Sequence, residues 1–232
     1  MQRIVAPARL ALERATRIGD IIDMSTPQKI PSQDSPASGS DALQWTQALL
    51  DGRRTTLPKR LRSPGPDAAQ QAAILTAAAA APDHGQRLPW RFIEIPQARR
   101  AELAQAFAAA LLERDPDASA DEQEQAREKA YRAPWLLLAV CHVRGGDPDI
   151  PGQERLLSAG CAIQNMLLLA SAAGYGSGLT SGKALTSRTL RQLFALHDDE
   201  DALCFLNFGS ISEVRRGKPR PDSSAYFSRL GD

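Results

Sequence analysis

Two predominantly apolar runs mark the centre of the expected fold. The first covers residues 135–143 and the second covers residues 202–208, which Gly209 closes. Continuous apolar runs of this length are typical of strands that other elements cover on both faces. A further strand is expected in the aromatic-rich segment 90–95. The pattern therefore predicts a buried central sheet.

Around these runs, apolar residues recur at helical spacing and predict helices. The helices cover residues 41–52, 67–81, 98–112, 119–131, 153–173 and 186–194. Capping boxes are expected at the N-caps Asp41, Asp67 and Ser119, because each is followed three residues later by Gln or Glu. Thr186 is expected to cap the last helix. Small residues in the 153–173 helix would allow close packing, either in the core or against a second subunit.

The first 40 residues lack this pattern. Residues 9–22 could form a short basic amphipathic turn or helix, whereas residues 25–40 are rich in Ser, Pro and Gln and are expected to be disordered. A flexible extension, an upstream start codon before Met24 and a transit-like peptide all stay open. We assign this segment no function and place the folded domain at residues 41–232.

The composition is that of a soluble globular protein with one sizeable core. The chain has 232 residues, 43% of them hydrophobic and 24% charged, and a net charge of +1. This balance argues against a nucleic-acid or polybasic membrane role. The three cysteines, at positions 141, 161 and 204, lack metal-binding or CxxC spacing, so we expect buried free thiols in a reducing cytoplasm.

A polar corner interrupts the apolar pattern between the helix at 67–81 and the strand at 90–95. It contains Pro82, Asp83, His84 and Gly85, and Pro89 is expected to push the preceding residue, Leu88, towards extended geometry. The corner carries a histidine at its tip. A solvated connection and a positioned functional loop are both compatible with these residues.

Directly after the helix that Gly52 closes, the chain reads Arg53-Arg54-Thr55-Thr56. Guanidinium groups and hydroxyls at a helix end suit a phosphate, which accepts forked hydrogen bonds and needs neutralisation. The alternative is that the arginines complement the helix dipole.

Residues 174–182 contain four glycines, which would let the backbone approach a ligand closely. These glycines follow a helix, whereas the dinucleotide-binding turn precedes one, so we reject that motif. A short strand that ends in a polar turn is expected instead.

Side-chain chemistry is scarce along the chain. The sequence contains no Gly-x-Ser-x-Gly elbow, Walker loop or HExxH motif, and its histidines number three. His142 is expected to be a packed or edge residue. His197 stands in an acidic turn that could hold a base or a metal, although a flexible solvated loop is the preferred interpretation. No metal site is predicted. A bound cofactor that supplies the chemistry would explain why reactive side chains are few.

The corner residues 81–85, with Leu-Pro-Trp-Arg-Phe at 88–92, resemble the nitroreductase-type FMN flavoproteins, in particular their YdjA-like branch. The resemblance extends from Ala42 to the C-terminus. It implies an α+β fold in which helices surround a central, mostly antiparallel sheet. It also implies an interlocked homodimer with FMN at the subunit interface.

The resemblance assigns cofactor contacts to particular residues. They are Arg53, Arg54, Thr55, Ala80, His84, Leu179, Thr180, Ser181, Lys218 and Arg220. The first three resemble the family segment that holds the FMN phosphate and ribityl groups, and the two basic residues near the C-terminus resemble a second phosphate contact. Residues 179–181 match the segment along the isoalloxazine ring, where Leu179 and Thr180 replace the tryptophan and arginine of the YdjA-like protein.

The function that this resemblance implies is an FMN-dependent NAD(P)H oxidoreductase. Hydride would pass from NADH or NADPH to flavin N5 and then, in a ping-pong cycle, to a nitroaromatic, quinone or similar flat acceptor. No catalytic side chain is assigned, because hydride transfer requires none. Two alternatives are a non-catalytic flavin-binding or storage protein on the same fold, and a helical interaction protein that binds no flavin.

Overall fold

The computed structural model describes residues 39–213 and 219–231. The predictions made for residues 1–38 therefore lie outside the described residues. The chain divides into two compact units, residues 1–47 and residues 48–232. Helix α2 (Gly39–Gly52) crosses this division, and all of the strands described here belong to the second unit.

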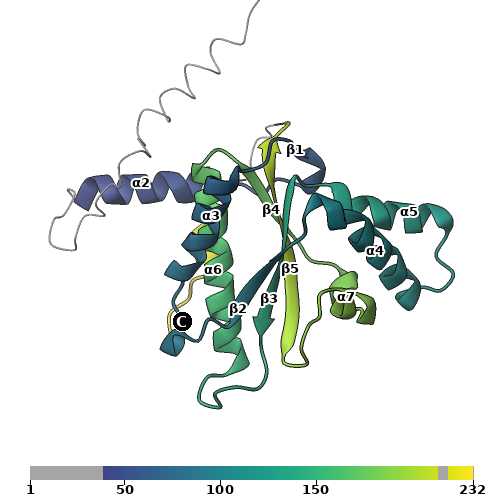
Figure 1. Cartoon of the computed structure of the whole chain (residues 1–232). Helices are drawn as coiled ribbons and strands as arrows, with labels where there is room; N and C mark the ends of the chain where they lie inside the picture. The colour runs from purple at the N-terminus through teal and green to yellow at the C-terminus, as the bar shows by residue number, and fades with distance from the viewer. Residues whose placement is uncertain (1–38, 214–218, 232) are drawn as a thin grey trace, which may run out of the picture. The chain divides into compact units, whose positions relative to one another are not determined.

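The second unit contains one five-stranded antiparallel sheet, which confirms the expected sheet type (Figure 1). Its strands are β1 (Leu61–Arg62), β2 (Trp90–Glu94), β3 (Trp135–His142), β4 (Gly176–Thr180) and β5 (Glu200–Ile211). The two longest strands, β3 and β5, pair at the centre of the sheet, as their apolar sequences predict. Strands β2 and β4 pair along their outer sides.

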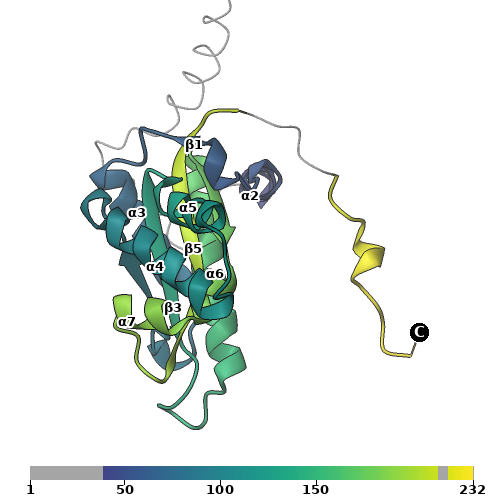
Figure 2. The ribbon, with the colours of Figure 1, turned by 90° about the vertical axis from the view of Figure 1, so that its right-hand side faces the viewer.

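Helices cover both faces of this sheet. Those in the second unit are α3 (Ala68–Ala77), α4 (Arg100–Arg114), α5 (Ala120–Glu128), α6 (Gly152–Ala172) and α7 (Arg188–Leu193). Short 3₁₀ turns extend or connect them, at η1 (Pro58–Arg60), η2 (Ala78–Ala80), η3 (His84–Gln86), η4 (Gln97–Arg99), η5 (Lys129–Tyr131), η6 (Lys183–Thr186) and η7 (Ser223–Ala225). Figure 2 shows α4, α5 and α7 in front of the sheet.

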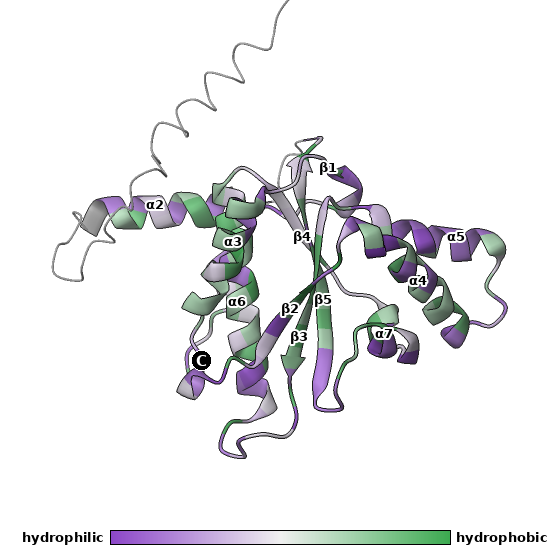
Figure 3. Cartoon of the chain, viewed as in Figure 1, coloured by the Kyte–Doolittle hydropathy of each residue, from purple (hydrophilic) through white to green (hydrophobic). Residues whose placement is uncertain are grey.

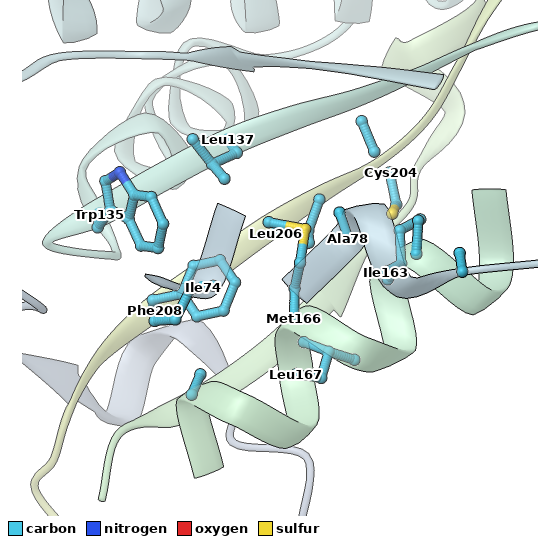
Figure 4. Packing of buried hydrophobic residues seen from close by; sticks show 14 residues of the cluster. Ile74, Ala78, Trp135, Leu137, Ile163, Met166, Leu167, Cys204, Leu206 and Phe208 are labelled. Atoms are coloured by element: carbon cyan, nitrogen blue, oxygen red, sulfur yellow. The ribbon is translucent and has the colours of Figure 1, made fainter. Parts of the chain in front are cut away.

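Side-chain alternation along β3 explains its continuous apolar sequence. Trp135 and Leu137 pack into a cluster with α3 and α6, whereas Leu136 and Leu138 pack into a second cluster with α4, α5 and α7. Figure 4 shows the first cluster, and Figure 3 shows the hydrophobic centre of the sheet beside the largely hydrophilic α5. Both faces of the strand are therefore buried, as predicted.

Two of the three predicted capping boxes are confirmed, at Asp67 and Ser119. Asp41 is not an N-cap, because α2 begins at Gly39 and places this carboxylate inside the first turn, where it still complements the helix dipole. The prediction at Thr186 is also wrong, since Ser187 caps α7 by accepting a hydrogen bond from the Leu190 amide.

The long helix α6 contributes to the core and also leaves a side uncovered. It has the length and apolar composition of a membrane span, but its most apolar stretch is 44% buried within this chain. Cys161 lies on the uncovered side, so the expectation of three buried thiols is wrong for this residue. Cys141 and Cys204 are buried, and burial raises the pKa of each thiol to about 11.

Candidate functional site

Three guanidinium groups meet just beyond the C-terminal end of α2. Arg220 donates hydrogen bonds to the carbonyl oxygens of Leu50 and Arg53, at 3.0 and 3.1 Å. Arg54 donates to the carbonyl oxygens of Asp51 and Arg53. Partial burial lowers the pKa of Arg53, and the nearby charges of Arg220 and Arg54 lower it further. Like charges held this close favour the binding of an anion between them.

These arginines also cap the helix, so the helix-dipole alternative is realised as well. The carbonyl groups at a helix C-terminus lack intrahelical partners, and Arg54 and Arg220 satisfy some of them. Each guanidinium has five N–H donors, whereas these hydrogen bonds use one nitrogen from each side chain. Donors therefore stay available for a ligand. Lys218, the other predicted phosphate contact, lies outside the described residues.

The chain then runs alongside the outer side of β4. Thr55 forms a parallel bridge with Ser177, and the amide of Thr56 donates to the Ser177 carbonyl at 2.8 Å. Gly178 is required here, because a Cβ atom would lie 2.4 Å from the carbonyl oxygen of Thr56. This close approach connects the arginine cluster to the segment that begins with Leu179.

At the end of β4, Thr180 is held by the buried residue Asn207. The Asn207 amide donates to Thr180 Oγ1 at 3.1 Å and to the Gly178 carbonyl at 3.1 Å. Sequence reasoning missed Asn207, although a polar residue inside an apolar strand is a visible signal. The arrangement directs one lone pair of the threonine hydroxyl at the amide and leaves its hydrogen free to donate elsewhere.

A cavity of about 520 Å³ opens beside this strand end, between β4, β5 and helices α4 and α5. We call it the α4–β4 cavity. Its apolar wall includes Phe107 and Phe205, whose rings lie edge to face with centroids 5.5 Å apart. Thr180 and Ser181 line its polar side. The sequence analysis did not predict this cavity, because its lining residues come from separate segments of the chain.

The corner that carries His84 has an unusual backbone. Gly85, Gln86 and Leu88 all have positive φ angles, of 65°, 52° and 48°. The expectation of an extended Leu88 is therefore wrong. The Leu88 amide donates to the carboxylate of Asp83 at 2.7 Å, which holds the tight conformation. Backbone strain of this kind persists only where surrounding contacts impose it.

His84 lies far along the fold from the arginine cluster. Its Nδ1 atom is 2.8 Å from Oε1 of Glu154, in the first turn of α6, whereas Thr55 pairs with Ser177, just beyond the other end of this helix. A helix of 21 residues is about 30 Å long. Ala80 belongs to the 3₁₀ turn that precedes the corner. Within one chain, the predicted site residues that the structure describes thus form two groups.

The acidic turn around His197 differs from its prediction as a flexible solvated loop. Glu200 is fully buried and accepts two hydrogen bonds from Arg91, at 2.6 and 2.8 Å. These hydrogen bonds lower the pKa of Glu200 to about 2, against the opposing effect of burial. His142 contacts Asp199 at 3.1 Å. Because both Glu200 oxygens accept hydrogen bonds from Arg91, this ion pair indicates a structural role. No group of metal-ligating side chains occurs among the described residues.

Comparison with known families decides what this architecture is. The model of the nitroreductase family matches residues 50–210. The chain belongs to the nitroreductase family. It is therefore an oxidoreductase of the nitroreductase type, as its sequence resemblance implies.

Two nitroreductase relatives align with most of this chain. A candidate NAD(P)H nitroreductase of Haemophilus influenzae is 32% identical over 165 residues, which are 71% of this chain and 88% of that protein. The candidate NAD(P)H nitroreductase YdjA of Escherichia coli K12 is 32% identical over 172 residues, or 73% and 88% of the two chains. The YdjA-like resemblance is thus confirmed.

Solved structures of the nitroreductase fold agree with the observed architecture. A nitroreductase-like protein from Bacillus cereus superposes with a TM-score of 0.69 at 18% identity, over 80% of this chain and 96% of that one. A point mutant of the FMN- and NADPH-dependent nitroreductase NfnB from Sphigopyxis sp. strain HMH superposes with a TM-score of 0.62 at 21% identity. That superposition covers 80% of this chain and 99% of NfnB. At these identities the likeness establishes the fold.

Proposed function

We propose that this nitroreductase-family chain is an FMN-dependent NAD(P)H oxidoreductase that reduces a flat acceptor such as a nitroaromatic or a quinone. The observation that carries the proposal is the meeting of Arg53, Arg54 and Arg220 beside the outer side of β4. For a nitro acceptor, the reaction consumes NAD(P)H and one proton and yields NAD(P)⁺, a nitroso product and water.

The arginine cluster fits the phosphate end of FMN. A phosphate monoester carries about 1.5 to 2 negative charges near neutral pH and offers three strong acceptor oxygens. Partial burial, followed by the neighbouring charges of Arg220 and Arg54, lowers the pKa of Arg53, so an anion between these cations would relieve their repulsion. Thr55, which is exposed next to the cluster, adds a hydroxyl donor.

The end of β4 fits the ring end of the same cofactor. Gly178 lets the Thr55–Thr56 segment lie directly against β4, Leu179 is 44% exposed, and Thr180 and Ser181 supply hydroxyls. When bound, the flavin supplies the hydride acceptor and donor for the reaction. The chain's own residues bind and orient: Asn207 fixes the Thr180 hydroxyl, so that one hydrogen-bond donor is held ready at the ring edge.

We also propose that two chains complete each site. His84 and Arg53 belong to groups near opposite ends of α6, so a single ligand that contacts both requires a second subunit. The uncovered side of α6 supports this assembly: Leu157 is 70% exposed, and a Cβ atom added at Gly160 would have open space around it. In this homodimer, Ala80 and His84 of one subunit face the flavin that the other subunit anchors.

The test starts from the purified full-length protein. Its visible spectrum should contain flavin bands, heat should release FMN, and the loaded protein should oxidise NADH or NADPH only when a nitroaromatic or quinone is present. A protein that neither contains nor takes up FMN would contradict the proposal. A yellow protein that transfers no electrons to any acceptor would instead favour the flavin-storage alternative.

We further propose that the oxidoreductase acts in the cytoplasm, where its free thiols would stay reduced.

A further inference from the structure

The α4–β4 cavity carries a concentration of positive charge that the flavin assignment does not use. Four cationic side chains line it, namely Arg114, Lys129, Arg132 and Lys183. Within the part of the chain that the structure describes, none of the four takes part in an ion pair. The whole protein has a net charge of only +1, so this charge is local.

The carboxylate that lines the cavity is already hydrogen-bonded within its own helix cap. Glu122 is the one carboxylate among its described lining residues. Its oxygen Oε2 accepts hydrogen bonds from the backbone amide and the hydroxyl of Ser119, at 2.9 and 2.8 Å, in the capping box of α5. A side chain held in a cap has little freedom to neutralise several cations. The cavity rim is thus positive on balance.

The inner wall has the opposite character. Phe107, Leu111, Leu136 and Phe205 provide an apolar surface, and the edge-to-face phenylalanine pair gives it a flat component. A volume of about 520 Å³ lies in the range of small-molecule sites. An apolar wall beneath a cationic rim is suited to a planar ring that bears an anionic group.

We propose that the α4–β4 cavity receives the electron acceptor and selects acceptors in which a flat apolar ring carries a carboxylate or similar anion. Lys129 and Lys183 are the specificity-determining residues, because they reach the cavity from two separate segments, at the end of α5 and directly after β4. This inference rests on the proposed function. It adds the chemical class of the acceptor, and cationic acceptors should be rejected.

Binding can be measured without turnover. Calorimetric titration of the oxidised, FMN-loaded protein with benzoate and with benzamide compares two rings of nearly the same shape that differ in charge. Benzoate should bind more tightly, and Lys129→Gln should weaken its binding about three- to tenfold, as expected for a partly exposed charge-assisted contact. Benzamide binding should change little. Arg127→Gln is the matched control, because it removes one charge from α5 at a residue that pairs with Glu124 and does not line the cavity.

Turnover separates this inference from the proposed function. With 4-nitrobenzoate and 4-nitrobenzamide as acceptors, the ratio of their kcat/KM values should favour the anion and fall towards one in the Lys129→Gln/Lys183→Gln double variant. If a flavin-loaded protein reduces both acceptors but shows no such preference, or keeps its preference in the double variant, the acceptor inference is overturned and the oxidoreductase proposal stands. A rise in KM confined to NAD(P)H would also overturn it, because the cations would then serve the dinucleotide phosphates. Absence of flavin and of all turnover defeats the proposed function itself.

Discussion

The guanidinium of Arg220 donates to the backbone carbonyl of Arg53 at 3.1 Å, although 167 positions separate the two residues. This contact brings a residue from the C-terminal segment to the end of α2. Two cationic side chains are thereby held at one place by a helix end that needs donors for its carbonyl groups. The C-terminal segment is thus part of the candidate phosphate site.

Arg53→Ala should weaken FMN retention. We expect a loss of about 1–3 kcal/mol, the range for a charge-assisted contact with phosphate. The dissociation constant can be measured by flavin fluorescence after equilibrium dialysis. Arg99→Ala is the control, since Arg99 is exposed and pairs with Glu102 on the surface. Equal affinity in the two variants would refute the phosphate assignment.

Gly178→Ala should damage both stability and flavin binding. The new Cβ atom would lie 2.4 Å from the Thr56 carbonyl oxygen, which is part of the backbone and has little room to move. We expect a destabilisation on the order of 1–3 kcal/mol, as for other overpacked positions. Thermal unfolding of the apoprotein measures it. Gly182→Ala is a matched control, because nothing lies within 4 Å of its added Cβ atom; a Tm change of the same size there would discredit the steric argument.

The Arg91–Glu200 ion pair should make stability depend on pH. The pKa of Glu200 is lowered to about 2 in the folded protein, from an ordinary value of 4.5. A lowered carboxyl pKa stabilises the fold above the unfolded value, and the contribution disappears as the pH falls from about 4.5 towards 2. Glu200→Gln should therefore lose on the order of 1–3 kcal/mol at pH 7.

Urea unfolding at pH 7 and at pH 3 tests this dependence. The difference between the native protein and Glu200→Gln should shrink at the lower pH. Glu124→Gln removes an exposed partner of Arg127 and should cost less than about 1 kcal/mol at either pH. A pH-independent defect in Glu200→Gln would mean that the carboxylate contributes through packing alone.

Leu157→Glu should separate the subunits. This side chain is 70% exposed in one chain, so the substitution leaves the isolated fold intact while it places a charge in the proposed α6 interface. Sedimentation should show monomers that have also lost FMN. Leu112→Glu, at an exposed position of α4, should stay dimeric and yellow. A flavin-loaded monomer from the native protein would contradict the shared site.

Removal of residues 1–40 should leave FMN binding and NAD(P)H oxidation unchanged. The family match begins at residue 50, and the candidate site residues described here all follow residue 40. Flavin content and turnover of the shortened protein test this. Lost flavin would show that the N-terminal extension contributes to the site.

Much of the fold follows from local patterns in the sequence. The apolar sequences of β3 and β5, and the capping boxes at Asp67 and Ser119, express local physical preferences that survive folding. The pattern could not reveal Glu200 as a buried clamp, because its partner Arg91 stands 109 positions away. Likewise, the charged side of α5 becomes a cavity rim only when η6 lies opposite it. Tertiary contacts between distant segments decided each of these differences.

The placement of His84 and Arg53 near opposite ends of α6 has a consequence for mixtures of defective chains. A chain in which His84 is substituted keeps its own arginine cluster, and a chain in which Arg53 is substituted keeps its own His84. In the proposed homodimer, a pair of two such chains would have one site with both intact halves and one site with neither. Two inactive preparations would then regain activity on mixing, as complementing alleles do, up to about one site in four if the chains exchange at random.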